Sequence, residues 1–374
     1  MRLRLVDLPV ISLAIIGLIP AAHAGELDQA PLRGSSAYDA ASSYPINAPE
    51  PTYREPPPRS SYPTAYPTKT GPTRPVAPPP AQLHNFTFDL GTRIWYSTGT
   101  LAKDLYDDPR FSKVLNSRLT YAGLTTGNFE GFGRVNTSFG SFIKGNVGFG
   151  GLERGTLNDE DFPPNTAPYS STMSRQQGGR VAYGSVDFGQ IVVKNDRVSV
   201  GLFAGFGYLA EKVNAYGCNQ IAGNPFVCVP AFGTGVLAIT EDSAWQFARL
   251  GILGEFKILD RLTLSAEVAW LPYEQVSAHD THWLRLGSSP FDISGPIPEN
   301  GGGNGVQLEA ILSYQFSDRV SFGLGGRYWH LQTHGNTDFE NVIIGFPSPG
   351  PQPVNFTATR YGGFAQGAYR FGPL

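Results

Sequence analysis

The chain divides near residue 84 into two parts with different patterns of hydrophobic and polar positions. From His84 onward apolar and polar residues alternate with a period of two, most regularly over 262–270, 306–316 and 320–328. Side chains at positions i and i+2 of an extended segment point the same way, so this alternation predicts strands with one apolar face. A soluble β-sandwich would show the same alternation, so the pattern alone predicts only an all-β fold.

The lengths of the connections distinguish a barrel from a sandwich. Tight links at 194–197, 259–261 and 317–319 alternate with long links at about 152–179, 213–241, 279–304 and 334–356. Short turns at one end and long loops at the other are typical of outer-membrane barrels, and closure removes exposed strand edges. We therefore expect a closed ten-stranded antiparallel transmembrane β-barrel over residues 84–374. Its strands are expected near 84–98, 115–136, 141–152, 180–193, 197–212, 242–258, 261–278, 304–316, 320–333 and 357–372.

The composition agrees with a barrel and argues against one class of partner. The chain has 45 Gly, 24 Phe and 17 Tyr but only 2 Met, so it is rich in turn formers and aromatics and poor in helix formers. The net charge of -3 and the absence of a basic stripe argue against a nucleic-acid partner. Aromatic residues gather near the expected strand ends, where membrane girdles belong. They are Tyr208, Trp245, Trp270, Tyr314, Phe316, Tyr328, Tyr369 and Phe371.

The first 24 residues have the form of a signal peptide. Arg2 and Arg4 precede an apolar run over 8–19, and Ala22-His23-Ala24 has the small-x-small form of a cleavage site. The run is too short, and too broken by proline and glycine, for a transmembrane helix. We therefore expect export to the outer membrane of a Gram-negative bacterium, with insertion by the barrel assembly machinery.

Residues 25–83 are expected to form a disordered periplasmic segment. The stretch 44–80 is Pro-rich, which opposes helix and sheet and favours extended polyproline II. Its simpler interpretation is a semi-rigid spacer. A docking strip for a cell-wall or protein partner, anchored by Tyr44, Tyr53, Tyr62 and Tyr66, is the alternative, and the sequence does not distinguish the two.

Cys218 and Cys228 are the two cysteines of the chain and lie in one expected loop. In an oxidising compartment such a pair is expected to form a local disulfide, worth about 2–3 kcal/mol by chain-entropy arguments. The alternative is a reactive or metal-binding thiol pair, but the sequence nearby lacks His or acidic ligands. We therefore expect a disulfide and no metal site.

Two acid-rich motifs follow expected strands at the same end of the barrel. One is Asn158-Asp159-Glu160-Asp161-Phe162 and the other is His279-Asp280-Thr281-His282. In extended segments Asp159 and Asp161 share one side, and Asp280 and His282 another. Two carboxylates facing a carboxylate–imidazole pair can hold and deprotonate a water molecule. The alternative is an ordinary solvated acidic surface, which outer loops of barrels often carry.

Three stretches resemble the omptins, a family of ten-stranded outer-membrane proteases. They are Ser117-Arg118-Leu119-Thr120-Tyr121, Gly155-Thr156-Leu157-Asn158-Asp159-Glu160-Asp161-Phe162 and Asp280-Thr281-His282. The resemblance implies an aspartyl-type endopeptidase that cleaves a peptide substrate. Asp159 and Asp161 would form its acidic pair, Asp280 would orient the imidazole, and His282 would act as general base. It also implies lipopolysaccharide as an activator, with no cofactor.

The chain departs from the omptin pattern in the substrate pocket. The family carries an acidic residue where this sequence has Ala278, and Asp104 is only a loose candidate for the other pocket acid. The sequence therefore does not predict recognition of basic side chains. Trp283 and Trp329 suit an apolar or aromatic group instead, so the expected substrate-binding residues are Trp283, Trp329 and Asp104.

Strict alternation places the Asp280–His282 pair on the lipid side, counting from Leu262. A one-residue slip must therefore occur before it, for which Pro272 is a plausible bulge site, and a similar slip at Gly150-Gly151 must precede Asp159. The rival function is a non-enzymatic barrel: a structural or adhesion protein, or a small channel. Ten strands leave a lumen that inward ion pairs among Arg93, Glu267, Glu309 and Arg327 could fill, so a wide pore is not expected.

Overall fold

The computed structural model describes residues 86–106, 114–162, 167–287, 292–339 and 351–372. The expected signal peptide over 1–24 and the expected Pro-rich segment over 25–83 lie outside the described residues. Within the described part, one 3₁₀ turn accompanies the strands, and no helix is long and apolar enough to cross a membrane.

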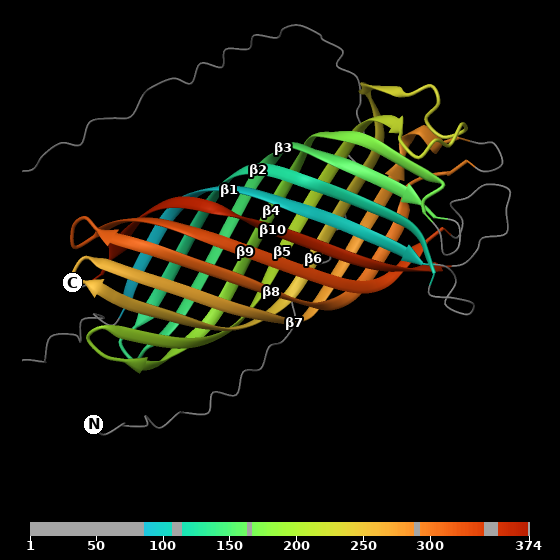
Figure 1. The fold of residues 1–374 in the computed structure, drawn as a ribbon. Coiled ribbons are helices and arrows are strands. Elements are labelled where there is room, and N and C mark those ends of the chain that lie inside the picture. The colour runs from blue at the N-terminus through green and yellow to red at the C-terminus, as the bar shows by residue number, and fades with distance from the viewer. Residues whose placement is uncertain (1–85, 107–113, 163–166, 288–291, 340–350, 373–374) are drawn as a thin grey trace, which may run out of the picture. The chain divides into compact units, whose positions relative to one another are not determined.

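Ten antiparallel strands form one closed barrel, in which each strand pairs with its neighbours in sequence and the last pairs with the first (Figure 1). The strands are β1 (Phe86–Tyr106), β2 (Leu115–Thr137), β3 (Ser141–Asp161), β4 (Ser170–Lys194), β5 (Val198–Gln220), β6 (Phe232–Leu259), β7 (Leu262–His282), β8 (Ile297–Gln315), β9 (Val320–Asp338) and β10 (Pro351–Phe371). Phe88 pairs with Phe371 where the barrel closes. The expected fold class and strand number are confirmed.

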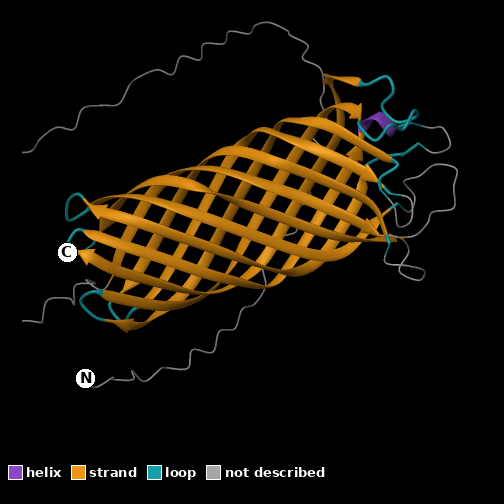
Figure 2. Cartoon of the chain, in the orientation of Figure 1, coloured by secondary structure: helices purple, strands orange, loops and turns teal. Residues whose placement is uncertain are grey.

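The tight turns lie at the barrel end where β1 starts and β10 finishes, and the long connections lie at the opposite, outer end (Figure 2). The strands extend further toward the outer end than expected. β3 reaches Asp161 rather than residue 152, and β7 reaches His282 rather than residue 278. The expected loop bounds were therefore wrong at this end. Outward positions there are polar or small, as at Thr98 and Thr100, so the alternation that marks a strand persists only on the inward face.

A belt of exposed apolar side chains surrounds the lower part of the barrel. Ile94, Val147, Phe149 and Leu324 are each exposed by 64–69%. On β7 the apolar outward positions end at Tyr273, and the next outward residues are polar. They are Gln275, Ser277 and His279. An apolar band flanked by aromatics is the lipid-facing surface of a transmembrane barrel, so the outer part of β7 beyond Tyr273 projects from the membrane.

Ion pairs and aromatic rings cross the lumen at the height of the belt. Arg327 contacts Glu130 at 2.7 Å and Glu309 at 2.6 Å, and Arg93 contacts the same two carboxylates at 3.1 and 2.9 Å. The rings of Trp95, Tyr183 and Trp329 pack edge to face around Arg327. We call these seven residues the plug. Glu267 also forms ion pairs inside the barrel, with Lys144 and Arg249.

Trp245 does not belong to the membrane girdle, contrary to the expectation from its place near a strand end. It is fully buried in the lumen, where its ring packs against Phe356 with centroids 5.6 Å apart. Tyr208, Trp270 and Tyr369 are exposed on the outer wall as a girdle requires. The parity of β6 explains the difference, because its odd-numbered residues face inward.

Candidate active site

A bulge in β7 turns Asp280 into the lumen. The pairing of β7 shifts by one residue against both neighbours, between Trp270 and Glu274. Before this point the even-numbered residues, such as Trp270, are exposed; after it the even-numbered residues, such as Glu274 and Asp280, are buried. The slip expected near Pro272 therefore occurs, and the extra residue reverses the faces of the strand.

A second irregularity does the same for β3. Leu152 and Leu157 are both buried, so the inward parity changes from even to odd between them. The pairing with β2 shifts around Thr125, which lies opposite Arg154. The slip was expected at Gly150-Gly151 and lies a few residues beyond them. Asp159 and Asp161 follow on the inward face and are partly buried.

Asp280 and His282 form a close pair at the outer end of β7. His282 Nε2 lies 3.2 Å from Asp280 Oδ2, and the two side chains are 17% and 5% exposed. The pair stands seven residues beyond Tyr273, which at about 3.3 Å per residue is roughly 23 Å along the strand from the edge of the lipid-facing belt. The pair therefore lies outside the membrane, at the mouth of the barrel.

The electrostatics of this pair favour a charged imidazole. Burial alone would raise the pKa of Asp280, but the nearby His282 and Lys103 outweigh it and the pKa lies below its ordinary value. Burial alone would lower the pKa of His282, but the carboxylate of Asp280, aided by Asp159, raises it above the ordinary value. A carboxylate that is ionised over the physiological range can orient an imidazole and stabilise its protonated form.

Asp159 and Asp161 face this pair from β3. Burial raises the pKa of Asp159 to about 6; the charge of His282 opposes the increase and that of Asp161 adds to it. Burial also raises the pKa of Asp161, against a hydrogen bond from the Ser117 side chain. The structure thus brings all four expected catalytic residues into one electrostatically coupled group. They lie on strand ends rather than in the loops where the sequence placed them.

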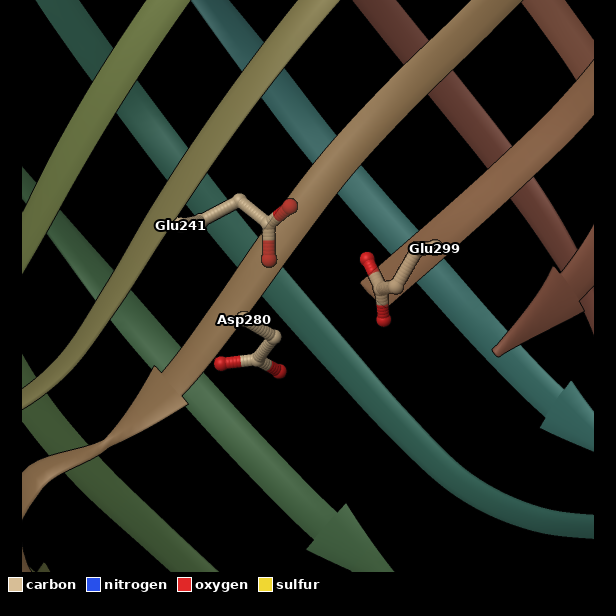
Figure 3. Close-up of side chains that lie close together, drawn as sticks. All are labelled: Glu241, Asp280 and Glu299. Atoms are coloured by element: carbon tan, nitrogen blue, oxygen red, sulfur yellow. The ribbon is translucent and has the colours of Figure 1, made fainter. Parts of the chain in front are cut away.

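The Asp280 carboxylate is one of three buried carboxylates that converge from neighbouring strands (Figure 3). They belong to Glu241 on β6, Asp280 on β7 and Glu299 on β8, and their oxygens lie within 4.8 Å of one another. The group would be close enough to hold a metal ion, but the Lys103 ammonium occupies its centre. Lys103 Nζ lies 2.5, 2.7 and 3.1 Å from the three carboxylates. We call these four residues the lysine cage.

Of the expected substrate-binding residues, the structure brings only Trp283 to the site. Its ring is 46% exposed, and its indole N–H donates to Thr240 Oγ1 at 2.9 Å. Trp329 belongs to the plug and is 6% exposed, so it cannot reach a substrate at the mouth. Asp104 is one of the outward-facing residues of β1, and its carboxylate accepts two hydrogen bonds from the guanidinium of Arg118. Ala278 is inward and buried, opposite Glu299 in the β7–β8 pairing.

Sequence reasoning missed Lys103, Glu241, Glu299 and Tyr169. Lys103 continues the inward parity of Arg93 and Trp95, so the alternation was visible once β1 is extended past residue 98. Glu241 and Glu299 lay in segments interpreted as loops. Tyr169, 54% exposed, donates its backbone N–H to the carbonyl of Asp161 at 2.9 Å, and thus stands beside the acidic pair.

Cys218, near the end of β5, forms a disulfide with Cys228 in the connection between β5 and β6. The segment that it closes presents exposed apolar side chains, among them Ile221 and Phe226, which are 56% and 91% exposed. The bond joins the end of β5 to this connection, so it fixes an apolar surface at the outer end of the barrel.

Comparison with known proteins supports the fold. No family model matches the chain, and no curated protein is similar to it in sequence. The crystal structure of the outer membrane protease OmpT from Escherichia coli is similar, with a TM-score of 0.61 and 15% identity over 78% of this chain and 98% of that one. This likeness shows a shared barrel fold and does not establish membership of the omptins.

Two other structures align with far lower scores. A FadL homologue from Pseudomonas aeruginosa has a TM-score of 0.28 with 10% identity, over 77% of this chain and 90% of that one. The toluene transporter TbuX from Ralstonia pickettii has a TM-score of 0.31 with 9% identity, over the same shares. Neither carries an argument about this chain. The barrel fold and its lipid-facing belt place the protein in the outer membrane.

Proposed function

We propose that this protein is a surface endopeptidase that activates water between the Asp159–Asp161 pair and the Asp280–His282 pair. His282 takes a proton from the water, and the resulting hydroxide attacks a peptide carbonyl. Asp280 orients the imidazole and stabilises its positive charge. The observation that carries the proposal is the 3.2 Å contact of His282 with the buried Asp280 at the mouth of the barrel, with Asp159 opposite.

The surroundings of the site support an extended substrate with apolar side chains. Trp283 and Tyr169, both about half exposed, stand beside the two pairs. The lysine cage supplies no free carboxylate for a basic side chain, since Lys103 occupies its centre. The similar Escherichia coli barrel is named a protease, and that activity is transferred to this chain only as a proposal.

The proposal is tested by digestion of a peptide library with the refolded full-length protein, with and without added lipopolysaccharide. We expect cleavage beside apolar or aromatic residues. An omptin protease run in parallel shows that the assay works. A folded barrel that cleaves nothing in either condition contradicts the proposal.

His282→Ala isolates the general base. General-base assistance is worth about 10²–10⁴ in rate, so turnover should fall by that factor while the barrel keeps its heat-modifiable gel mobility. His279→Ala is the matched control, because His279 is on the same strand but faces outward and is exposed. Equal losses in the two variants would show that the effect does not come from the site.

A non-enzymatic surface protein is the second candidate. The apolar segment fixed by the Cys218–Cys228 disulfide, with Phe226 91% exposed, supports a contact or adhesion surface at the outer end. A small channel fits less well, because the ion pairs and rings of the plug cross the lumen. Absence of peptidase activity in a folded barrel would favour the adhesion function.

A further inference from the structure

We propose that Lys103 is a positioning residue that holds the Asp280 carboxylate in the orientation from which it meets His282. The inference rests on the proposed function, because it assigns Lys103 a part in the same reaction. Lys103 is fully buried and contacts no substrate, so any effect on the reaction must pass through Asp280.

Lys103 reaches its partners by crossing the lumen. It extends from β1, whereas Glu241, Asp280 and Glu299 belong to β6, β7 and β8, on the opposite side of the ten-stranded ring. An ammonium group has three N–H donors, and the three carboxylates use all of them. The side chain therefore spans the lumen from β1 to the opposite strands, and the three carboxylates fix the position of its ammonium group.

The contact with Asp280 involves the oxygen that serves the imidazole. Lys103 Nζ lies 2.7 Å from Asp280 Oδ2, and His282 Nε2 lies 3.2 Å from the same oxygen. Asp280 Oδ1 is buried without a hydrogen-bond partner among the described residues. Lys103 and His282 therefore both hold Oδ2, and Lys103 does so from within the lysine cage. Without Lys103, rotation of the carboxylate would break one charged hydrogen bond fewer.

Charged groups from several elements act on the pair, and Lys103 is the cation beneath it. Asp159 and Asp161 approach from β3, and Arg285 approaches from the turn η1 (Trp283–Arg285) that follows β7. Tyr121 on β2 contributes a buried hydroxyl near Asp280. Among the described residues, Glu241 and Glu299 of the cage also interact with the charge of Asp280.

A simpler role for Lys103 is that of a counter-charge that keeps buried carboxylates from destabilising the barrel. Removing one member of a buried ion pair leaves an uncompensated buried charge and is strongly destabilising, so Lys103→Met alone could lose activity by failing to fold. A paired variant separates the roles. Lys103→Met combined with Glu241→Gln removes one positive and one negative group, and so keeps the formal charge of the cage.

The experiment compares the double variant with Glu241→Gln alone, both as refolded full-length barrels. If Lys103 positions Asp280, the double variant folds but its kcat falls about 10- to 100-fold, as expected for a small misplacement of a catalytic group. KM changes by less than about twofold, because Lys103 contacts no substrate. Equal kcat values in the two proteins would overturn the proposal and leave Lys103 as a counter-charge.

A second measurement does not depend on peptidase activity. The chain has six histidines, so ¹⁵N-histidine labelling gives a simple spectrum in which His282→Ala identifies the His282 signals. If Lys103 holds Asp280 against His282, loss of the ammonium lets the carboxylate turn away from the imidazole. The pKa of His282 should then be lower in the double variant than in Glu241→Gln. An unchanged or raised pKa would overturn the proposal, because removal of a mere counter-charge does not lower it, and this readout holds even if the protein cleaves no peptide.

Discussion

Arg327 and Glu130 meet in the centre of the lumen, where Arg327 Nη1 lies 2.7 Å from Glu130 Oε2 and both side chains are at most 3% exposed. They come from β9 and β2, which do not pair with each other, so the contact ties distant parts of the ring together. Arg93 and Glu309 complete a group of two guanidinium and two carboxylate groups. The group separates the outer mouth of the barrel from the space at its turn end.

Glu130→Gln should destabilise the barrel. The substitution leaves Arg93 and Arg327 with Glu309 as their shared carboxylate in the plug, and breaking a buried ion pair in this way costs about 3–5 kcal/mol. The urea midpoint of unfolding from detergent micelles measures the effect. Glu153→Gln is the matched control, because Glu153 is exposed on the outer wall and its substitution should cost within about 0.5 kcal/mol. Equal midpoints for the two variants would mean that the plug contributes little to stability.

The wild-type barrel should conduct ions poorly. The plug combines ion pairs with the rings of Trp95, Tyr183 and Trp329. The centroids of these rings lie 4.9–5.5 Å from one another. A ten-stranded barrel is narrow enough for such side chains to fill. Single-channel recording in planar bilayers should therefore show no conductance at the level of a general porin. Porin-level conductance would mean that the plug opens in the membrane.

The fold was readable from the sequence because the lipid imposes one strict condition. Outward residues within the belt must be apolar, so strands such as 262–270 alternate clearly, and the tight turns mark their ends. Beyond the belt this condition is lifted. Thr98, Thr100 and Ala102 face outward without an apolar signal, which is why β1 was expected to end eight residues too early.

The candidate site was predictable only in part, and for a related reason. The four expected catalytic residues belong to two short motifs that can be recognised in the sequence. They are Asp159, Asp161, Asp280 and His282. The lysine cage has no such motif, because its members come from β1, β6, β7 and β8 and meet only when the ring closes. Trp329 was misplaced because the sequence gives its strand but not its depth in the lumen.

The pH dependence of turnover should reflect His282. A general base must be unprotonated, and the carboxylates around His282 hold its pKa above the ordinary value of 6.5. kcat/KM should therefore rise with pH along a limb centred above 6.5 and then level off. Asp280→Asn removes the anion that raises this pKa, so the limb of its residual activity should move to lower pH.

These profiles are measured on the best library peptide, with gel mobility checked at each pH. A limb centred at or below 6.5 in the wild type, or one that stays in place in Asp280→Asn, would contradict the assignment of the base. Loss of the folded form at the acidic end would invalidate those points, which is why the mobility control accompanies every rate.

Asp159→Asn should stabilise the protein at neutral pH while weakening its activity. The pKa of Asp159 is raised from 3.8 to about 6 in the folded state, so folding favours its protonated form. Stability therefore falls as pH rises from about 3.8 to about 6, and the full cost remains above that range. Asparagine resembles the protonated form and avoids this cost. We expect Asp159→Asn to be more stable than wild type by about 1–3 kcal/mol at pH 8, with the difference vanishing below about pH 4.

Urea unfolding at the two pH values measures this difference, with Asp260→Asn as a matched control in an exposed tight turn. A surface substitution of that kind should change stability by less than about 0.5 kcal/mol at pH 8. A gain confined to Asp159→Asn, together with a loss of turnover, would show that the barrel retains a destabilising buried carboxylate because the site requires its charge. If Asp159→Asn is instead less stable than wild type at pH 8, the interaction of its carboxylate with His282 outweighs the cost of burial, and the two groups form a stabilising ion pair.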